Sequence, residues 1–500
     1  MAEKQTIIIS KSDFLQQSGT NKIVEELKLH FKDKPLIVSD VTDNAGHQYV
    51  DLVQEGGGVL GVALVGYTYV LEKMGIRFFS LAGTSAGSIN AMLLASTGNK
   101  EDEKVEKIVE DILSLDFFSL VDGKTSNWKF TKKVKALVQK LLLRKNFFKR
   151  IMALVKWALI ILFILTLGCF IVNFFLPGIA KWIGLAAAVV LVLLITGAIS
   201  VRNKFKAFSK NGYGLNEGKV FHQWINKVIS SNYVAADPSK GPITNMADFA
   251  QHFMRVPASL AVKPDTRRTN NNPPNMPMLT IITCDITAER KIEFPAMWEL
   301  YWAKQEDAHP GDFVRASMSI PVFFETYCLT DIRKKSSFNI WDKHLNWQNE
   351  KKNIPDKAQF IDGGTLSNFP INVFYNPNYP VPRMPTFGIR LQDGILDAAN
   401  RSQGSFFKYL GSLFSTIRFN FDRDFITKNR AYNFGVKQVD VKEHSWLNFF
   451  MEDKEKMELF RKGALAAADF LRHFDWEKYK AERLKNFELG LERFANPNNL

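Results

Sequence analysis

Two long uncharged runs in the middle of the chain limit what it can fold into. Residues 157–176 and 182–201 are each 20 residues long and contain no Asp, Glu, Lys or Arg. At about 1.5 Å per helical residue, each run covers about 30 Å, the thickness of the hydrocarbon core of a bilayer. The connector 177–181 is a short Pro-Gly turn, so the runs predict a transmembrane helical hairpin. A buried hairpin in a large soluble core is the alternative.

The positive charge of the chain is concentrated beside these runs. The net charge is +14, from 65 basic and 51 acidic residues. Fifteen of the basic residues lie in the flanks 124–156 and 202–210, which hold no acidic residue, and the rest of the chain is nearly neutral. This distribution argues against nucleic-acid binding. It predicts flanks that contact anionic lipid headgroups, with both termini in the cytoplasm. The spacing of apolar residues over 130–142 also suits a calmodulin-type target helix.

The remaining composition is that of a large globular protein. The chain is 46% hydrophobic and 23% charged, which excludes a disordered protein. Three cysteines, none in a C-x-x-C pair, make a disulfide scaffold or a cysteine zinc site unexpected. The N-terminus shows no apolar stretch behind a basic start, so no signal peptide is expected.

Upstream of the runs, a pattern of strand, glycine loop and helix occurs twice. Each time a short apolar stretch is followed by glycines and then by a longer apolar segment with helical spacing. This order implies parallel strands with right-handed crossovers, and a site at the carboxyl ends of the strands. The predicted elements are strand 49–53, helix 59–74, strand 76–82 and a helix that starts at Ser88.

The first loop, Gly56-x-Gly58-x-x-Gly61, has the spacing of a dinucleotide-binding fingerprint. Such a site also needs an acidic residue about 20 positions further on, at the end of the second strand. The sequence has Ala82-Gly83-Thr84-Ser85 there. We therefore do not expect a nucleotide site.

The second loop, Gly83 to Gly87, has the pattern G-x-S-x-G of a serine hydrolase nucleophile elbow. Glycines on both sides of Ser85 permit a sharp turn that exposes the hydroxyl, and the following helix directs its N-terminal dipole at it. The N–H groups of Gly56, Gly57 and Gly58 can approach a developing oxyanion closely, because these residues lack a Cβ.

A serine nucleophile needs a base, and Asp362 is the candidate that we favour. It ends an apolar stretch and is followed by Gly363 and Gly364, although Asp-Gly is often only a turn. A Ser-His-Asp triad would need a later histidine. Only His444 and His473 follow Asp362, and they lie in a polar loop and a helical run. No histidines have the spacing of a metal site.

The glycine loop, the elbow and the Asp-Gly-Gly turn, in this order, resemble the patatin-like phospholipase family. The segments 314–324 and 214–219 are similar to weaker blocks of the family, and the resemblance covers roughly residues 48–475 apart from 124–210. Arg315 matches a basic residue often present in its block. Leu60 stands where many members have Lys or Arg, so no cation is expected at that point.

The resemblance implies an α/β fold of three layers with a mainly parallel central sheet, here interrupted by the hairpin. It implies a serine–aspartate dyad, without histidine, metal or cofactor, that hydrolyses acyl esters of lipids. The roles it implies are Ser85 as nucleophile, Asp362 as base, Gly56, Gly57 and Gly58 as the oxyanion hole, and Gly61, Gly83, Gly87, Gly363 and Gly364 as motif glycines.

The expected protein is therefore a membrane-anchored acyl hydrolase that acts on phospholipids or other membrane lipids. The alternatives are a non-catalytic membrane scaffold with the same fold, and a thioesterase or acyltransferase that uses the same dyad. The expected parts are an N-terminal extension (1–47), the first catalytic part (48–123), a basic and transmembrane insert (124–210), the second catalytic part (211–400) and a helical C-terminal part (401–500).

Overall fold

The computed structural model describes residues 9–122, 212–236, 241–268, 270–347, 353–376, 378–392 and 422–495, with eight isolated positions between them. The chain divides into two compact units, residues 1–122 with 216–500 and residues 123–215. All predicted site residues belong to the first unit. The basic flanks lie outside the described residues, apart from position 203.

The predicted membrane localisation needs a correction. Among the described residues, no helix is long and apolar enough to cross a membrane. The long helices that are described, such as α15 (Asp453–His473), carry charged residues along one side and bury the other in the core. On this finding we no longer assign the chain as an integral membrane protein with a two-span hairpin. The runs 157–176 and 182–201 lie outside the described residues, apart from six isolated positions.

A mixed sheet forms the centre of the first unit. Its strands run in the order β12-β11-β2-β3-β6-β10-β9, and β12 through β6 are parallel. The sheet is less parallel than predicted, because β10, β9, β7, β5 and β1 pair antiparallel. The bounds are β1 (Val41–Thr42), β2 (Gln48–Gln54), β3 (Ile76–Thr84), β5 (Ala261–Val262), β6 (Leu279–Asp285), β7 (Arg290–Phe294), β9 (Tyr327–Thr330), β10 (Lys357–Asp362), β11 (Thr386–Gln392) and β12 (Val436–Asp440), with β4 (Gly214–Asn216) and β8 (Val322–Phe324) outside this sheet.

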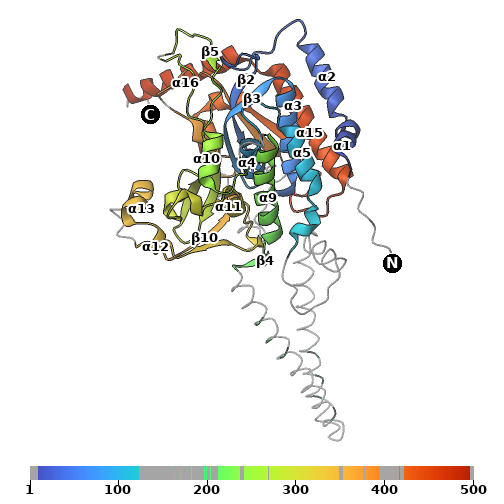
Figure 1. Ribbon diagram of the computed structural model, residues 1–500, viewed down its shortest axis with the longest axis vertical. Helices are drawn as coiled ribbons and strands as arrows, with labels where there is room; N and C mark the ends of the chain where they lie inside the picture. The colour runs from blue at the N-terminus through green and yellow to red at the C-terminus, as the bar shows by residue number, and fades with distance from the viewer. Residues whose placement is uncertain are drawn as a thin grey trace. The chain divides into compact units, whose positions relative to one another are not determined.

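Two helices pack side by side against the sheet. Helix α3 (Val62–Lys73) is apolar on nearly all sides, because it lies between strand β3, α15 and α5 (Val105–Ser114). Helix α4 (Ala86–Ser96) covers β2, β3 and β6 on the same face (Figure 1). The other helices are α1 (Lys11–Ser18), α2 (Thr20–His30), α9 (Lys219–Ala236), α10 (Met246–Phe253), α11 (Pro310–Ser317), α12 (Ile332–Lys335), α13 (Phe338–Leu345) and α16 (Trp476–Ala495).

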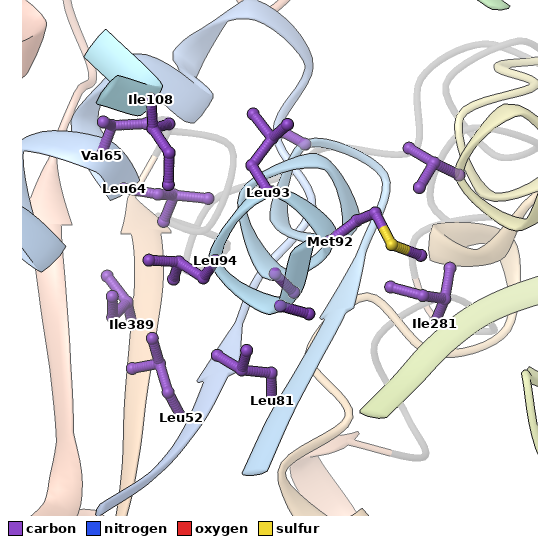
Figure 2. Close-up of a cluster of buried hydrophobic side chains, with 14 of the residues drawn as sticks. Leu52, Leu64, Val65, Leu81, Met92, Leu93, Leu94, Ile108, Ile281 and Ile389 are labelled. Carbon is purple, nitrogen blue, oxygen red and sulfur yellow. The ribbon is translucent and has the colours of Figure 1, made fainter. Parts of the chain in front are cut away.

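The main core lies between these helices and the sheet. Figure 2 shows side chains from four parallel strands directed toward α4 and α3. In β2, β6 and β11 the core residues occupy every second position, because successive side chains of a strand point to opposite faces of the sheet. One face of the sheet therefore supplies this core. The residues labelled there are Leu52, Leu81, Ile281 and Ile389 from the strands and Leu64, Val65, Met92, Leu93, Leu94 and Ile108 from the helices.

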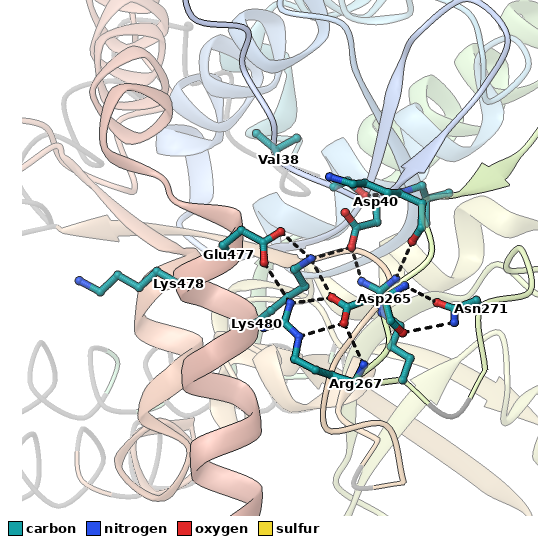
Figure 3. A network of polar contacts seen from close by, with 12 residues as sticks. Val38, Asp40, Asp265, Arg267, Asn271, Glu477, Lys478 and Lys480 are labelled. Atoms are coloured by element: carbon teal, nitrogen blue, oxygen red, sulfur yellow. Dashed lines mark hydrogen bonds and ion pairs between the residues drawn. The ribbon is translucent and has the colours of Figure 1, made fainter.

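A network of buried ion pairs attaches the C-terminal helix to the rest of the first unit. Lys480 of α16 binds Asp40 at 2.9 Å and Asp265 at 3.1 Å. Arg268 also binds Asp40, and Arg267 binds Asp265 at 2.6 Å (Figure 3). The side chains of Lys480, Asp40 and Arg268 are at most 3% exposed. The network therefore joins three segments that lie far apart in the sequence.

Asp51, in the middle of β2, makes stability depend on pH. Burial raises the pKa of its carboxyl group to about 7, although Ser80 and Arg383 offset part of the effect. The folded chain therefore holds this proton more tightly than the unfolded chain, and this contribution to stability is lost as pH rises from about 4 to about 7.

We expect the Asp51→Asn variant to be more stable than the wild type at pH 8, by at most about 4 kcal/mol. Near pH 4, where the wild-type carboxyl group is protonated, the two proteins should differ little. Thermal unfolding of both proteins at several pH values between 4 and 8 measures this difference. An equal free energy of unfolding at every pH would contradict the expectation.

Candidate active site

Ser85 forms a sharp turn between a strand and a helix. Strand β3 ends at Thr84 and helix α4 begins at Ala86, so Ser85 alone makes the connection. Its backbone has φ 51° and ψ −118°, a conformation that costs free energy for a residue with a side chain. A Cβ on Gly83 would overlap the carbonyl oxygen of Gly87, and one on Gly87 would overlap that of Gln54. The two glycines are therefore required by close backbone contacts at the turn.

Hydrogen bonds from distant segments hold this turn in place. The N–H of Ser85 donates to Ser317 Oγ at 2.9 Å, and Ser317 Oγ donates to the Ile282 carbonyl at 2.6 Å. The Thr84 hydroxyl donates to the Ser367 carbonyl at 3.0 Å. These partners stabilise a strained backbone, and none of them belongs to the G-x-S-x-G motif.

Asp362 lies at the same level of the sheet as Ser85. It is the last residue of β10 and pairs with Thr283 of β6, while Thr84 pairs with the adjacent Ile282. Strand β6 therefore separates the two residues, and two strand spacings place their backbones about 10 Å apart. Ser85 is 4% exposed and Asp362 is 8% exposed, so both side chains are largely shielded from water.

The Asp-Gly-Gly turn fixes the Asp362 side chain and backbone. The N–H of Gly364 donates to Asp362 Oδ1 at 2.7 Å, and the N–H of Asp362 donates to the Ser319 carbonyl at 2.8 Å. Gly363 lies so close to strand β6 that a Cβ would overlap the Ile282 carbonyl oxygen. The side chain of Arg315, which is buried, donates to Ser319 Oγ at 2.6 Å and so supports the segment that Asp362 binds.

The glycine loop passes directly beside Ser85. A Cβ on Gly56 would lie 3.1 Å from Ser85 Cβ, and one on Gly61 would lie 2.9 Å from Ala86 Cβ. The N–H of Gly56 donates to the Asn368 carbonyl at 3.0 Å, so it is already engaged. Within the described residues, the N–H groups of Gly57 and Gly58 have no backbone or side-chain acceptor. Of the three predicted oxyanion donors, these two have N–H groups available.

A cavity that is partly open to solvent lies beside Ser85, with about 690 Å³ of empty space when the open part is included. We call it the apolar cavity, because nearly all of its lining is hydrocarbon. The polar side chains in its lining are those of Ser85 and Asn90. Its walls come from the glycine loop, from α3, α4, α5 and α9, and from the segments after α5, after α11 and before α15. They include Val59, Ile89, Phe117, Trp224, Met318 and Phe449. Such a lining suits a long hydrocarbon chain.

One site residue was not predicted from the sequence. Asp422 is 5% exposed and accepts hydrogen bonds from Ser367 Oγ at 2.7 Å and from the N–H groups of Asn368 and Phe369 at 2.8 Å. The turn that it binds contacts both active-site loops, through the Thr84 hydroxyl and the N–H of Gly56. Asp422 belongs to no motif and lies 53 to 55 residues after its partners, so no local signal identifies it.

We expect Asp422→Asn to lower kcat about 10- to 100-fold while KM changes little. The amide removes one of two acceptor oxygens, and a shift of about 1 Å in the turn displaces both active-site loops. Hydrolysis of a soluble acyl ester, followed with circular dichroism to verify the fold, measures the effect. Asp424→Asn is the control, because Asp424 is 54% exposed and binds only Lys428 among described residues. Equal losses in both variants would contradict the positioning role.

The two histidines that follow Asp362 contact acidic side chains, and the side chain of His444 is only 7% exposed. His444 contacts Glu455 at 3.1 Å and Glu458 at 3.3 Å, and His473 contacts Asp469 of its own helix. Neither lines the apolar cavity. Leu60, the departure from the family pattern, is fully buried in the core. Ser85 and Asp362 therefore remain the predicted reactive residues.

Three comparisons with known proteins place this site in context. A family model described as "Patatin-like phospholipase" matches residues 52–375. "Uncharacterized protein YqhO" of Bacillus subtilis (strain 168) is 22% identical over 431 residues, which cover 86% of this chain and 100% of that protein. The crystal structure of VipD from Legionella pneumophila aligns with a TM-score of 0.36 and 14% identity, over 90% of this chain and 73% of VipD. A TM-score this low carries no argument.

Proposed function

We propose that this chain, which belongs to the patatin-like phospholipase family, hydrolyses acyl esters of lipids with Ser85 as nucleophile and Asp362 as base. Membership of the family supports a lipid acyl hydrolase in general terms. The observation that carries the specific assignment is the position of Ser85. It lies on a strained turn, beside two available N–H groups and in the wall of an apolar cavity.

In the first step, the Ser85 hydroxyl attacks the ester carbonyl of the lipid. Asp362 takes the hydroxyl proton, for which its position across strand β6 and its largely buried environment are suitable. The carbonyl oxygen becomes an oxyanion, and the N–H groups of Gly57 and Gly58 stabilise it. Collapse of this intermediate releases the alcohol, which takes the proton from Asp362, and leaves the acyl group on Ser85.

In the second step, Asp362 takes a proton from water, and the resulting hydroxide attacks the acyl-serine. The fatty acid is released and the Ser85 hydroxyl is restored with the same proton. The acyl chain occupies the apolar cavity throughout, where burial of its methylenes contributes about 0.8 kcal/mol each. Asp362 thus serves both half-reactions, and no histidine or metal ion is required.

A fluorophosphonate probe and a lipid assay test this proposal together. We expect the wild-type protein to be labelled at Ser85, identified by peptide mass spectrometry, and to release fatty acid from phospholipid or acylglycerol vesicles. Labelling without release from any lipid, but with hydrolysis of acyl thioesters, would favour the thioesterase alternative. A protein that is neither labelled nor active on any acyl ester would be a non-catalytic scaffold.

A further inference from the structure

A second cavity lies behind the apolar cavity. It lies between helices α1, α3, α5 and α15 and is small, with about 230 Å³ not filled by atoms, part of which is open to solvent; we call it the back cavity. Phe14, Val109, Leu113 and Phe460 line it and do not line the apolar cavity. The active site thus has a second apolar space near it that the proposed reaction does not use.

A thin partition separates the two cavities. Val62 and Val65 of α3 and Ile112 of α5 line both of them. The two valines are three residues apart and therefore lie on the same side of their helix. Val65 projects from α3 toward α5 in Figure 2, and α3 and α5 pack against each other. A single layer of aliphatic side chains is therefore all that divides the two spaces.

The back cavity is suited to hydrocarbon. Its polar lining residue is Lys456, whose ammonium group binds Asp453 at 3.2 Å and lies 5.0 Å from the centre of the Phe117 ring. The charge of Lys456 is therefore already compensated, and its methylene stem can contact an apolar ligand. Phe117 itself lines the apolar cavity, so the same lysine contacts the walls of both spaces.

We propose that Val65 and Ile112 set the longest acyl chain that the enzyme accepts, by closing the apolar cavity toward the back cavity. This inference rests on the proposed function, because it concerns the acyl chain of the ester that Ser85 attacks. The ligand is an unbranched fatty acyl chain. For a chain that fits within the apolar cavity, each added methylene contributes further binding free energy. A longer chain meets the partition, so its additional methylenes contribute no further binding free energy.

The partition has a measurable consequence for chain-length preference. Each methylene that finds apolar space is worth about a fourfold gain in kcat/KM, the equivalent of about 0.8 kcal/mol. Val65→Ala and Ile112→Ala open the partition, so the optimum should move to longer chains. We compare kcat/KM for an ester longer than the wild-type optimum with kcat/KM for a short ester. The ratio of the long-ester value to the short-ester value should be at least fourfold higher in these variants than in the wild type.

The experiment uses the full chain and 4-nitrophenyl esters with saturated acyl chains of increasing length. Val109→Ala is the matched control, because Val109 lines only the back cavity and its truncation leaves the partition intact. Its profile should match that of the wild type, while those of Val65→Ala and Ile112→Ala shift. Val65→Leu adds volume to the partition and should shorten the longest accepted chain. This variant keeps the test valid if the alanine variants unfold.

Two outcomes overturn the inference. One is a profile that stays unchanged in Val65→Ala, Ile112→Ala and Val65→Leu. The other is a shift in Val109→Ala as large as that in Val65→Ala. Either result leaves the proposed function intact, provided that the wild-type protein hydrolyses the esters through Ser85. Absence of hydrolysis in the wild type would instead contradict the proposed function. In that case, chain-length preference is measured by the displacement of a fluorescent fatty acid from Ser85→Ala protein by fatty acids of increasing length. The preferred length must shift in the same direction when the partition variants are added.

Discussion

Ser85→Ala is expected to reduce ester hydrolysis about 10⁴-fold or more, and Asp362→Asn about 10³-fold. The first removes the nucleophile, and the second replaces the base by an amide of the same shape that cannot accept the proton. Because the two groups act in one step, the double variant should be little worse than Ser85→Ala alone. Single-turnover and steady-state hydrolysis of a soluble ester measure all three losses.

The control for this experiment is Ser96→Ala, which truncates another buried serine of helix α4, away from the apolar cavity. Its kcat should remain within about twofold of the wild-type value, whereas all variants should keep their folded circular dichroism spectrum. Full activity in Ser85→Ala or in Asp362→Asn would remove that residue from the mechanism. A double variant much slower than either single variant would indicate that the two residues act independently.

Lys480→Met is expected to destabilise the protein by about 3 to 5 kcal/mol. It removes the cation that Asp40 and Asp265 share, so both carboxylates keep only part of their compensation in a buried site. Urea unfolding measures the loss. Lys478→Met is the control, since Lys478 is exposed and points away from the network in Figure 3, and it should change the free energy of unfolding by less than about 0.5 kcal/mol. Equal stability of both variants would contradict the expectation.

The same network predicts sensitivity to acid. Hydrogen bonds from Arg267, with further contributions from Lys480, hold the pKa of Asp265 well below its ordinary value. A depressed pKa means that this stabilisation is present above about pH 4 and is lost as pH falls toward the pKa of the folded state. The contribution of Asp265 to stability is lost as pH falls, whereas that of Asp51 is lost as pH rises. The two contributions are therefore separable by the pH range in which each is lost.

The local parts of the site could be predicted from the sequence. The spacing of apolar residues predicted the strand before Ser85 and the helix after it, and β3 and α4 occupy those positions. The five-residue motif also predicted the turn, because Gly83 and Gly87 are needed wherever a strand bends so sharply into a helix. The closest contact at Gly83 involves only residues of the motif, whereas the one at Gly87 involves Gln54 of the neighbouring strand β2.

Other features depended on segments far apart in the chain. Asp422 binds an active-site turn from a position that no motif marks, and Ser317 lies in a segment that the family resemblance marked without giving this serine a role. The Val65–Ile112 partition combines side chains 47 residues apart. The antiparallel placement of β10 also required the structure. Hydrogen bonds and cavity walls of this kind need only compatible side chains at the meeting point, so they leave no periodic pattern. The amino-acid sequence alone therefore determined the local turn and the candidate reactive residues, while the tertiary structure decided what supports them and how much space lies beside them.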